Sequence, residues 1–195
     1  MRCTLTAALL IFATPSIAPA QAEALVRGAK AEPLELGKDA AINLRSSSAG
    51  RVDAPLVFIC YGVRLPDHGH DDLTGLDLTG KVAVVLAGAA PKGIPGPALA
   101  AGRAAGVEAL HRGGAAGVLT IYSPQSDIPW NRYAPARLHP QMRLASDSMA
   151  GAAGSTVTVV LNPASAERIF SGSRRSYASI AGPGIRCIYS YLWLR

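Results

Sequence analysis

The sequence is poor in aromatic residues and does not contain the motifs of several common enzyme classes. Phe, Trp and Tyr make up 6% of its 195 residues, so the core must be built mainly from Val, Leu, Ile and Ala. No H-E-x-x-H pattern is present, which excludes the zincin type of metalloprotease helix. No G-x-S-x-G pattern is present, which excludes the nucleophile elbow of a serine hydrolase. The glycine-rich stretch at 88–96 fits neither G-x-G-x-x-G nor the Walker pattern, which argues against nucleotide binding.

Acidic residues are absent from the last part of the chain. Nineteen Lys and Arg against thirteen Asp and Glu give a formal charge of +6, and no acidic residue follows Glu167. Binding to nucleic acid would require basic residues interleaved with stacking aromatics on one face, a pattern this sequence does not show. We therefore interpret the charge as a basic C-terminal tail on a near-neutral domain.

Residues 1–22 have the composition of a signal peptide. Arg2 supplies a positive charge, an apolar run follows at 4–13, and the small residues near Ala20 and Ala22 fit a cleavage site. The apolar run is too short for a membrane-spanning helix. We expect cleavage after Ala20 or Ala22, a secreted or periplasmic protein, and loss of Cys3 with the leader.

Two cysteines, Cys60 and Cys187, remain after this cleavage. An exported protein could join them in a disulfide. Cys60, however, lies in an apolar run typical of a buried strand. The sequence therefore favours a buried free thiol at Cys60, with the Cys60–Cys187 disulfide as the alternative.

Apolar runs predict strands at 55–63, 81–87, 118–122 and 156–161, and a helical pattern covers 98–112 and 164–170. Because the run at 81–87 does not alternate with polar residues, we expect this strand to be covered on both faces. Together with turn-rich connections, this favours an α+β domain. The expected core consists of Val57, Ile59, Val82, Val84, Leu86, Val118, Leu119, Ile121, Val157 and Val159.

One stretch, 67–72, concentrates ionisable side chains. His70-x-Asp72 has the spacing of some zinc ligands, and imidazole and carboxylate are both zinc donors. The alternative is a turn in which Asp side chains accept backbone hydrogen bonds. A two-metal site needs further ligands and a general base, and the other acidic and His residues show no ligand spacing. We therefore assign no catalytic, cofactor-binding or metal residue, and expect Asp71 and Asp72 to hold the 66–80 loop.

Residues 54–87 resemble the protease-associated domain of bacterial secreted zinc aminopeptidases, a superfamily that includes the transferrin-receptor and glutamate-carboxypeptidase ectodomains. The likeness lies in an apolar strand ending in Tyr61-Gly62-Val63, then Asp71-Asp72, then Gly80-Lys81 before a Val-rich strand. The segments at 104–121, 127–130 and 162–173 resemble the same family. The similarity covers roughly residues 33–180.

The resemblance implies a two-sheet β core with flanking helices, inserted into a peptidase chain. In that family the domain is not the catalyst: it covers the active site and makes contacts with substrate or protein. Two zinc ions belong to a separate catalytic domain, whose ligand motifs this chain does not carry, so no cofactor is expected in this chain. The structural loop implied by the family comprises Tyr61, Gly62, Asp71, Asp72, Gly80 and Lys81.

We expect a flank with short strands at 23–50, a protease-associated-like domain at 51–165, and a short helix with a disordered or out-of-frame tail at 166–195. The predicted function is a non-catalytic fragment of an exported aminopeptidase-like protein, inactive alone. Its expected partners are a peptidase catalytic domain or a peptide, with no nucleic acid and no membrane span after leader removal. Two alternatives are a functional metallo-aminopeptidase completed by a catalytic region outside this chain, and a binding module using the 66–77 loop.

Overall fold

The structure is a computed structural model that describes residues 7–12, 23–27, 30–42, 51–124, 126, 129–132, 157–171, 173, 175–181 and 192–194. The strands are β1 (Ala7–Phe12), β2 (Glu23–Arg27), β3 (Lys30–Leu34), β4 (Ala40–Ile42), β5 (Arg51–Phe58), β6 (Arg64–Leu65), β7 (His70–Asp71), β8 (Val82–Ala87), β9 (Gly117–Tyr122), β10 (Val157–Leu161) and β11 (Leu192–Leu194). The helices are α1 (Gly96–Arg112), α2 (Ala166–Phe170) and α3 (Tyr177–Ile180), with short 3-10 turns η1 (Pro66–His68), η2 (Trp130–Arg132) and η4 (Pro163–Ser165).

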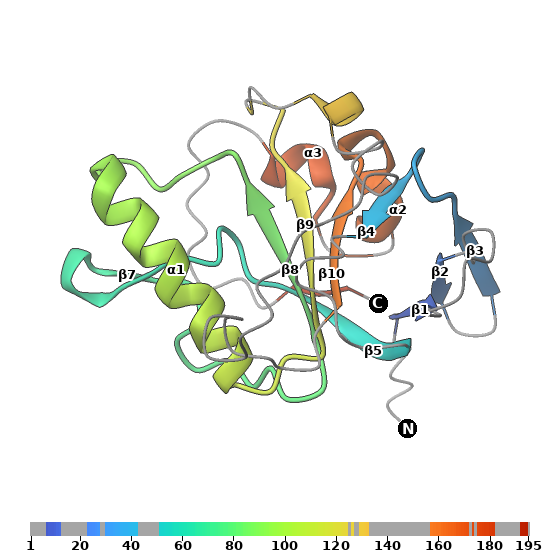
Figure 1. Cartoon of the computed structure of the whole chain (residues 1–195), viewed down its shortest axis with the longest axis horizontal. Helices are drawn as coiled ribbons and strands as arrows, with labels where there is room; N and C mark the ends of the chain where they lie inside the picture. Colours follow the sequence, from blue (N-terminus) through green and yellow to red (C-terminus); the bar gives the residue numbers. More distant parts are fainter. Residues whose placement is uncertain are drawn as a thin grey trace, which may run out of the picture.

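A large mixed sheet forms the centre of the molecule (Figure 1). Its strand order is β3-β2-β1-β5-β8-β9-β10-β4, and β11 pairs with β5 outside this order. Strands β5, β8, β9 and β10 run parallel, whereas β4 is antiparallel to β10, and β1 and β11 are antiparallel to β5. The short strands β6 and β7 form a second sheet. The predicted α+β class is therefore confirmed.

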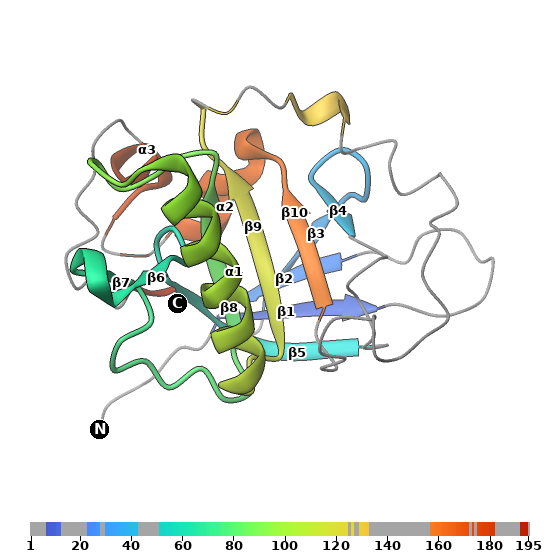
Figure 2. The same cartoon turned by 60° about the vertical axis from the view of Figure 1, so that its left-hand side comes forward.

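The two faces of the central strands are covered by different helices. Helix α1 joins β8 to β9 and lies over one face, and α2 and α3 lie over the other (Figures 1 and 2). Pro95 precedes α1, and the Gly113 amide donates to the Ala109 carbonyl oxygen where the helix ends. The predicted helix at 98–112 is thus confirmed, two residues longer at its N-terminus.

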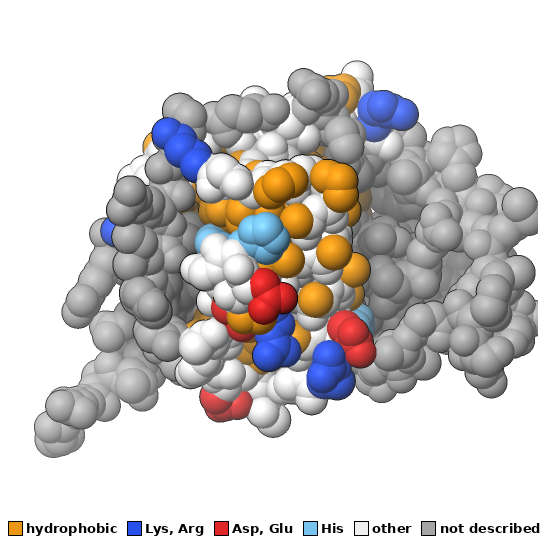
Figure 3. All heavy atoms as spheres, turned by 90° about the vertical axis from the view of Figure 1, so that its left-hand side faces the viewer, with side chains coloured by type: hydrophobic (Ala, Val, Ile, Leu, Met, Phe, Trp, Pro, Cys, Tyr) orange, Lys and Arg blue, Asp and Glu red, His pale blue; other side chains and the backbone are white. Residues whose placement is uncertain are grey.

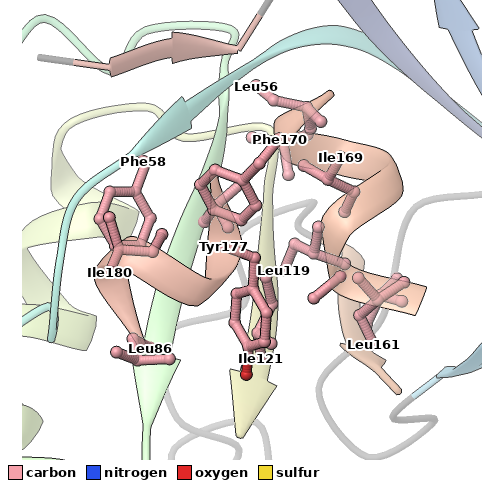
Figure 4. Close-up of a cluster of buried hydrophobic side chains, with 14 of the residues drawn as sticks. Leu56, Phe58, Leu86, Leu119, Ile121, Leu161, Ile169, Phe170, Tyr177 and Ile180 are labelled. Atoms are coloured by element: carbon pink, nitrogen blue, oxygen red, sulfur yellow. The ribbon is translucent and has the colours of Figure 1, made fainter. Parts of the chain in front are cut away.

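Each face of the sheet has its own hydrophobic cluster. Even-numbered residues of β5 and β8 and odd-numbered residues of β9 share a cluster with α2 and α3. The cluster on the other face contains Leu110 of α1 together with Val57, Ala83, Val85 and Val118 from these strands. On the α2 side, Phe58 meets Phe170 edge-on with ring centroids 5.5 Å apart, and Phe170 lies 6.0 Å from the Tyr177 ring (Figure 4). This arrangement explains the unbroken apolar runs of β5 and β8, which have buried side chains on both faces, whereas β9 and β10 alternate buried and partly exposed residues.

The predicted core is confirmed with one exception. All the predicted core residues are buried except Val118, which is partly buried against the cluster under α1. The core also extends beyond the predicted 51–165 domain. Leu34 and Ala40 join it from the N-terminal flank, and Tyr177 and Ile180 join it from α3.

The N-terminal flank is attached to α2 by a cluster of polar contacts around Asp39. The Asp39 carboxylate accepts hydrogen bonds from the Ser165 hydroxyl at 2.7 Å and from the Arg168 guanidinium at 3.2 Å. Arg168 also donates to the Pro33 carbonyl oxygen at 2.8 Å. These contacts join segments more than a hundred residues apart, and sequence reasoning did not predict them.

Both chain-terminal segments contribute strands to the outer edge of β5. Residues 192–194 of the predicted tail form β11 and pair with residues 56–58. Residues 182–191 lie outside the described part of the chain. Strand β1 lies within the predicted leader and pairs with residues 51–55, so leader removal would remove this strand. Within the described ranges, no helix has both the length and the apolar character needed to cross a bilayer.

Candidate functional site

The candidate site is the connection between β5 and β8, residues 59–81, which contains all six residues predicted as a structural loop. Strands β6 and β7 and the turn η1 lie within it. Gly69 allows the turn between η1 and β7, because its φ of 66° lies in the left-handed region that favours glycine. The Arg64–Asp71 and Leu65–His70 register then places the residues after β7 beside those before β6.

Asp72 is the central residue of this loop. Its Oδ2 atom accepts hydrogen bonds from the backbone amides of Tyr61 at 3.1 Å and Val63 at 3.0 Å. Its own amide donates to the Val63 carbonyl oxygen at 3.0 Å. The Asp72 side chain is only 3% exposed. One buried carboxylate therefore fixes the backbone of the segment that leaves β5.

Burial raises the pKa of Asp72 above its usual value. The hydrogen bonds from the Val63 and Tyr61 amides and the interaction with His70 favour the charged form and offset this only in part. Desolvation also raises the pKa of Tyr61, and the nearby Asp72 charge adds to this effect. The site thus holds a carboxylate in surroundings that favour its protonation.

His70 lies against the second oxygen of Asp72. Its Nε2 atom is 3.1 Å from Asp72 Oδ1, within range of an ion pair when the imidazole is protonated. The buried Nε2 has no aligned hydrogen bond, so the contact is one of proximity. The His70 ring also lies 6.4 Å from the Tyr61 ring.

Asp71 is directed to the other side of the turn. Its Oδ1 accepts a hydrogen bond from the Leu73 amide at 2.9 Å, the geometry of an Asx turn. Its Oδ2 pairs with the Arg64 guanidinium at 3.2 Å across the β6–β7 pair. Asp71 and Asp72 therefore hold different parts of the loop, as the turn interpretation of this stretch requires.

Gly80 and Lys81 belong to a second group at the other end of β8. The Lys81 ammonium contacts Asp77 Oδ2 at 2.6 Å and donates to the Asp77 carbonyl oxygen at 2.8 Å. The hydrogen bonds from Lys81 and from the Thr79 amide lower the pKa of Asp77 to about 2. Gly80 has a φ of 65°, and its amide donates to the Gly114 carbonyl oxygen at 2.9 Å.

The structure therefore separates the six predicted residues into two groups. Gly80 and Lys81 directly precede the first residue of β8, whereas the Cys60 carbonyl oxygen, next to Tyr61, accepts from the Leu86 amide near the end of β8. At about 3.3 Å per residue along a strand, the groups lie on the order of 15 Å apart. They brace opposite ends of one strand and form no common site.

Sequence reasoning missed the close approach of α1 to this loop. A Cβ atom at Gly106 would lie 1.9 Å from the Gly62 carbonyl oxygen, and one at Gly102 would lie 2.4 Å from the Leu65 side chain. The signal was present in the sequence as Gly-x-x-x-Gly spacing, which places both residues on one helix face. The partner of that face could not be read from the spacing.

Cys60 differs from its predicted state. It is buried, has a φ of 61°, and is disulfide-bonded, so the predicted free thiol is wrong. Neither Cys3 nor Cys187 is among the described residues, and the alternative Cys60–Cys187 pair involves a residue outside them.

Among the described residues, no group of three or more His, Cys, Asp or Glu side chains is placed to hold a metal ion.

Helix α1, which lies beside the loop, carries basic and acidic side chains over its C-terminal half and small apolar side chains between them. Figure 3 shows this face, where apolar side chains gather over α1 and charged ones surround them.

Comparison with known proteins yields no matching family model and no matching curated protein. The resemblance to the protease-associated domain therefore rests on the motifs quoted above.

Proposed function

We propose that this chain is an exported, non-catalytic domain of the protease-associated type, which associates with a peptidase catalytic region or with peptide. The observation that supports a non-catalytic role is the use of the Asp72 carboxylate. Its Oδ2 already accepts two backbone amides, and Oδ1 lies beside His70. A catalytic carboxylate needs an oxygen that can reach substrate, water or metal, whereas the Asp72 side chain is only 3% exposed and its Oδ2 atom is held by the two amides.

The other polar groups of the loop are used in the same way. Arg64 pairs with Asp71, and Lys81 pairs with Asp77. Such contacts stabilise a connection and offer no nucleophile–base pair. The order of the sequence motifs is the further support for the protease-associated type. The role implied by that resemblance is to cover a peptidase active site.

The test is an activity and metal measurement on the purified mature chain. We expect no release of arylamine from a leucine arylamide, and no stoichiometric zinc by elemental analysis after dialysis against zinc and a weak chelator. The Asp71→Ala/Asp72→Ala double variant is the matched control, because its metal content should equal that of the wild type while its stability falls.

Two results would separate the alternatives. Zinc at about two ions per chain, with turnover, would overturn the non-catalytic assignment and favour a functional peptidase. A single metal ion that raises the thermal midpoint of the wild type, but not that of the double variant, would instead favour a binding module at this loop.

A further inference from the structure

Cys60 is disulfide-bonded, and the sequence offers two partners. The chain contains three cysteines, so the second sulfur belongs to Cys3 or to Cys187. Two strands pair with the outer edge of β5: β1, which follows Cys3 in the chain, and β11, which follows Cys187. Their positions along β5 distinguish the two possible partners.

The route from the C-terminal side is short and open. Leu192 is directly opposite Phe58 in the antiparallel β11–β5 pair, and Cys60 follows Phe58 by two residues. Cys187 precedes Leu192 by five residues, which can span about 17 Å at full extension. A disulfide requires Cα atoms roughly 4.4–6.8 Å apart. The segment therefore reaches Cys60 with slack.

The route from the N-terminal side is blocked. In the β1–β5 pair Ala8 is opposite Pro55, and each step back along β1 is one step forward along β5. Continued in this register, Cys3 would come opposite Cys60 only by running beside residues 56–58. That edge is already paired with β11. The five residues from Ala8 to Cys3 can span about 17 Å, which is also the length of β5 and its continuation from Pro55 to Cys60. The chain therefore has no spare length to go around β11 and still reach Cys60.

We infer that Cys60 and Cys187 form a disulfide that holds the C-terminal strand β11 on the edge of β5. A second line of support rests on the proposed export, because removal of a leader ending at Ala20 or Ala22 takes Cys3 away. Two thiols lose two protons and two electrons as the sulfur–sulfur bond forms. A disulfide-bearing oxidoreductase of the oxidising compartment accepts them and becomes a dithiol.

This bond changes the role of the C-terminal residues. Strand β11 pairs with β5 over three residues, too few for stable association on their own. A covalent link five residues upstream keeps the strand beside its partner, and it closes a long loop that restricts the unfolded chain. The C-terminal segment is then a fastened part of the sheet, and reduction releases it.

The direct test is a peptide map of the full chain, expressed with its leader, exported, alkylated and digested with trypsin without reduction. Trypsin cuts after Arg51, Arg64 and Arg186. We expect the peptide 52–64 to be joined to the peptide 187–195, in a species that separates on reduction. The same map reports the N-terminus, so failure of the predicted export and failure of the disulfide are read independently.

Linkage of peptide 52–64 to a peptide containing Cys3, or alkylated Cys60 in the folded protein, would overturn the inference. As a second measurement, Cys187→Ser should lower the thermal midpoint by roughly 5–15 °C, and reduction should lower the wild type to the same value. Cys3→Ser is the matched control and should leave the midpoint unchanged. Equal effects of the two substitutions would also overturn the inference.

Discussion

Gly106 is the position where one added methyl group should most disturb the candidate site. Its Cβ would lie 1.9 Å from the Gly62 carbonyl oxygen and 3.0 Å from the Gly62 carbonyl carbon. Ordinary contact between such atoms needs more than about 3 Å, so α1 and the loop must separate by on the order of 1 Å. Both sides of the contact are backbone, and no side-chain rotation can relieve it.

The expected effect of Gly106→Ala is the balance of two terms. Alanine favours an α-helix over glycine by about 1 kcal/mol. Overpacking of a closed contact costs about 1–3 kcal/mol and sometimes more, and this contact is closer than those a flexible side chain could absorb. We therefore expect the free energy of unfolding to fall by roughly 1–2 kcal/mol despite the gain in helix propensity.

Urea denaturation followed by circular dichroism measures this change, with an unchanged slope showing that the unfolding transition is the same. Ala104→Gly is the matched control, because Ala104 is exposed on the same helix and reports the propensity term alone, a loss of about 1 kcal/mol. A Gly106→Ala protein as stable as the wild type, or more stable, would refute the close approach of α1 to Gly62.

Two further substitutions test the loop and the sheet. Asp72→Ala should destabilise the fold by about 2–4 kcal/mol, because the buried Tyr61 and Val63 amides lose their acceptor. Relative to Asp72→Asn, the wild type should gain stability as the pH falls through the raised Asp72 pKa towards the ordinary aspartate value of 3.8. The reason is that the folded state binds the proton more tightly than the unfolded state does. A parallel pH dependence of the two proteins would contradict this. Val84→Ala should cost about 1–3 kcal/mol, because Val84 is fully buried, whereas Val107→Ala, at a side chain 51% exposed, should change stability by less than about 0.5 kcal/mol. An unchanged thermal midpoint for Val84→Ala would contradict the burial of β8.

The parts of the fold that sequence reasoning predicted are those in which the local pattern and the burial agree. The run at 81–87 is apolar on both faces because β8 is central, with Val84 facing α2 and Ala83 facing α1. Helix α1 was predictable for a similar reason, since its alanine-rich sequence favours a helix without help from tertiary contacts.

The parts that could not be predicted depend on contacts between distant segments. Nothing in the sequence around Asp39 indicates that its carboxylate accepts hydrogen bonds from Ser165 and Arg168. The left-handed backbone conformation of Cys60 also could not be predicted, because the residue lies in an apolar run typical of a strand. The same run led to the prediction of a buried free thiol. Tyr177 lies in a basic, serine-rich stretch, yet it is buried and its hydroxyl donates to the Tyr122 carbonyl oxygen at 3.1 Å.

The segment leaving β5 is fixed from three sides, and this limits what the loop can bind. Within the loop, the Asp72 carboxylate accepts hydrogen bonds from the Tyr61 and Val63 amides. Helix α1 contacts the Gly62 carbonyl oxygen at Gly106. The Leu86 amide of β8 donates to the Cys60 carbonyl oxygen. A ligand that competed for Asp72 would have to leave two buried amides unpaired, each at a cost of about 1–3 kcal/mol. Binding that spares the fold falls instead to the exposed turn η1, whose side chains are all accessible. A binding role for this loop and a structural role for Asp72 are therefore separable, because they use different residues of the same acidic stretch.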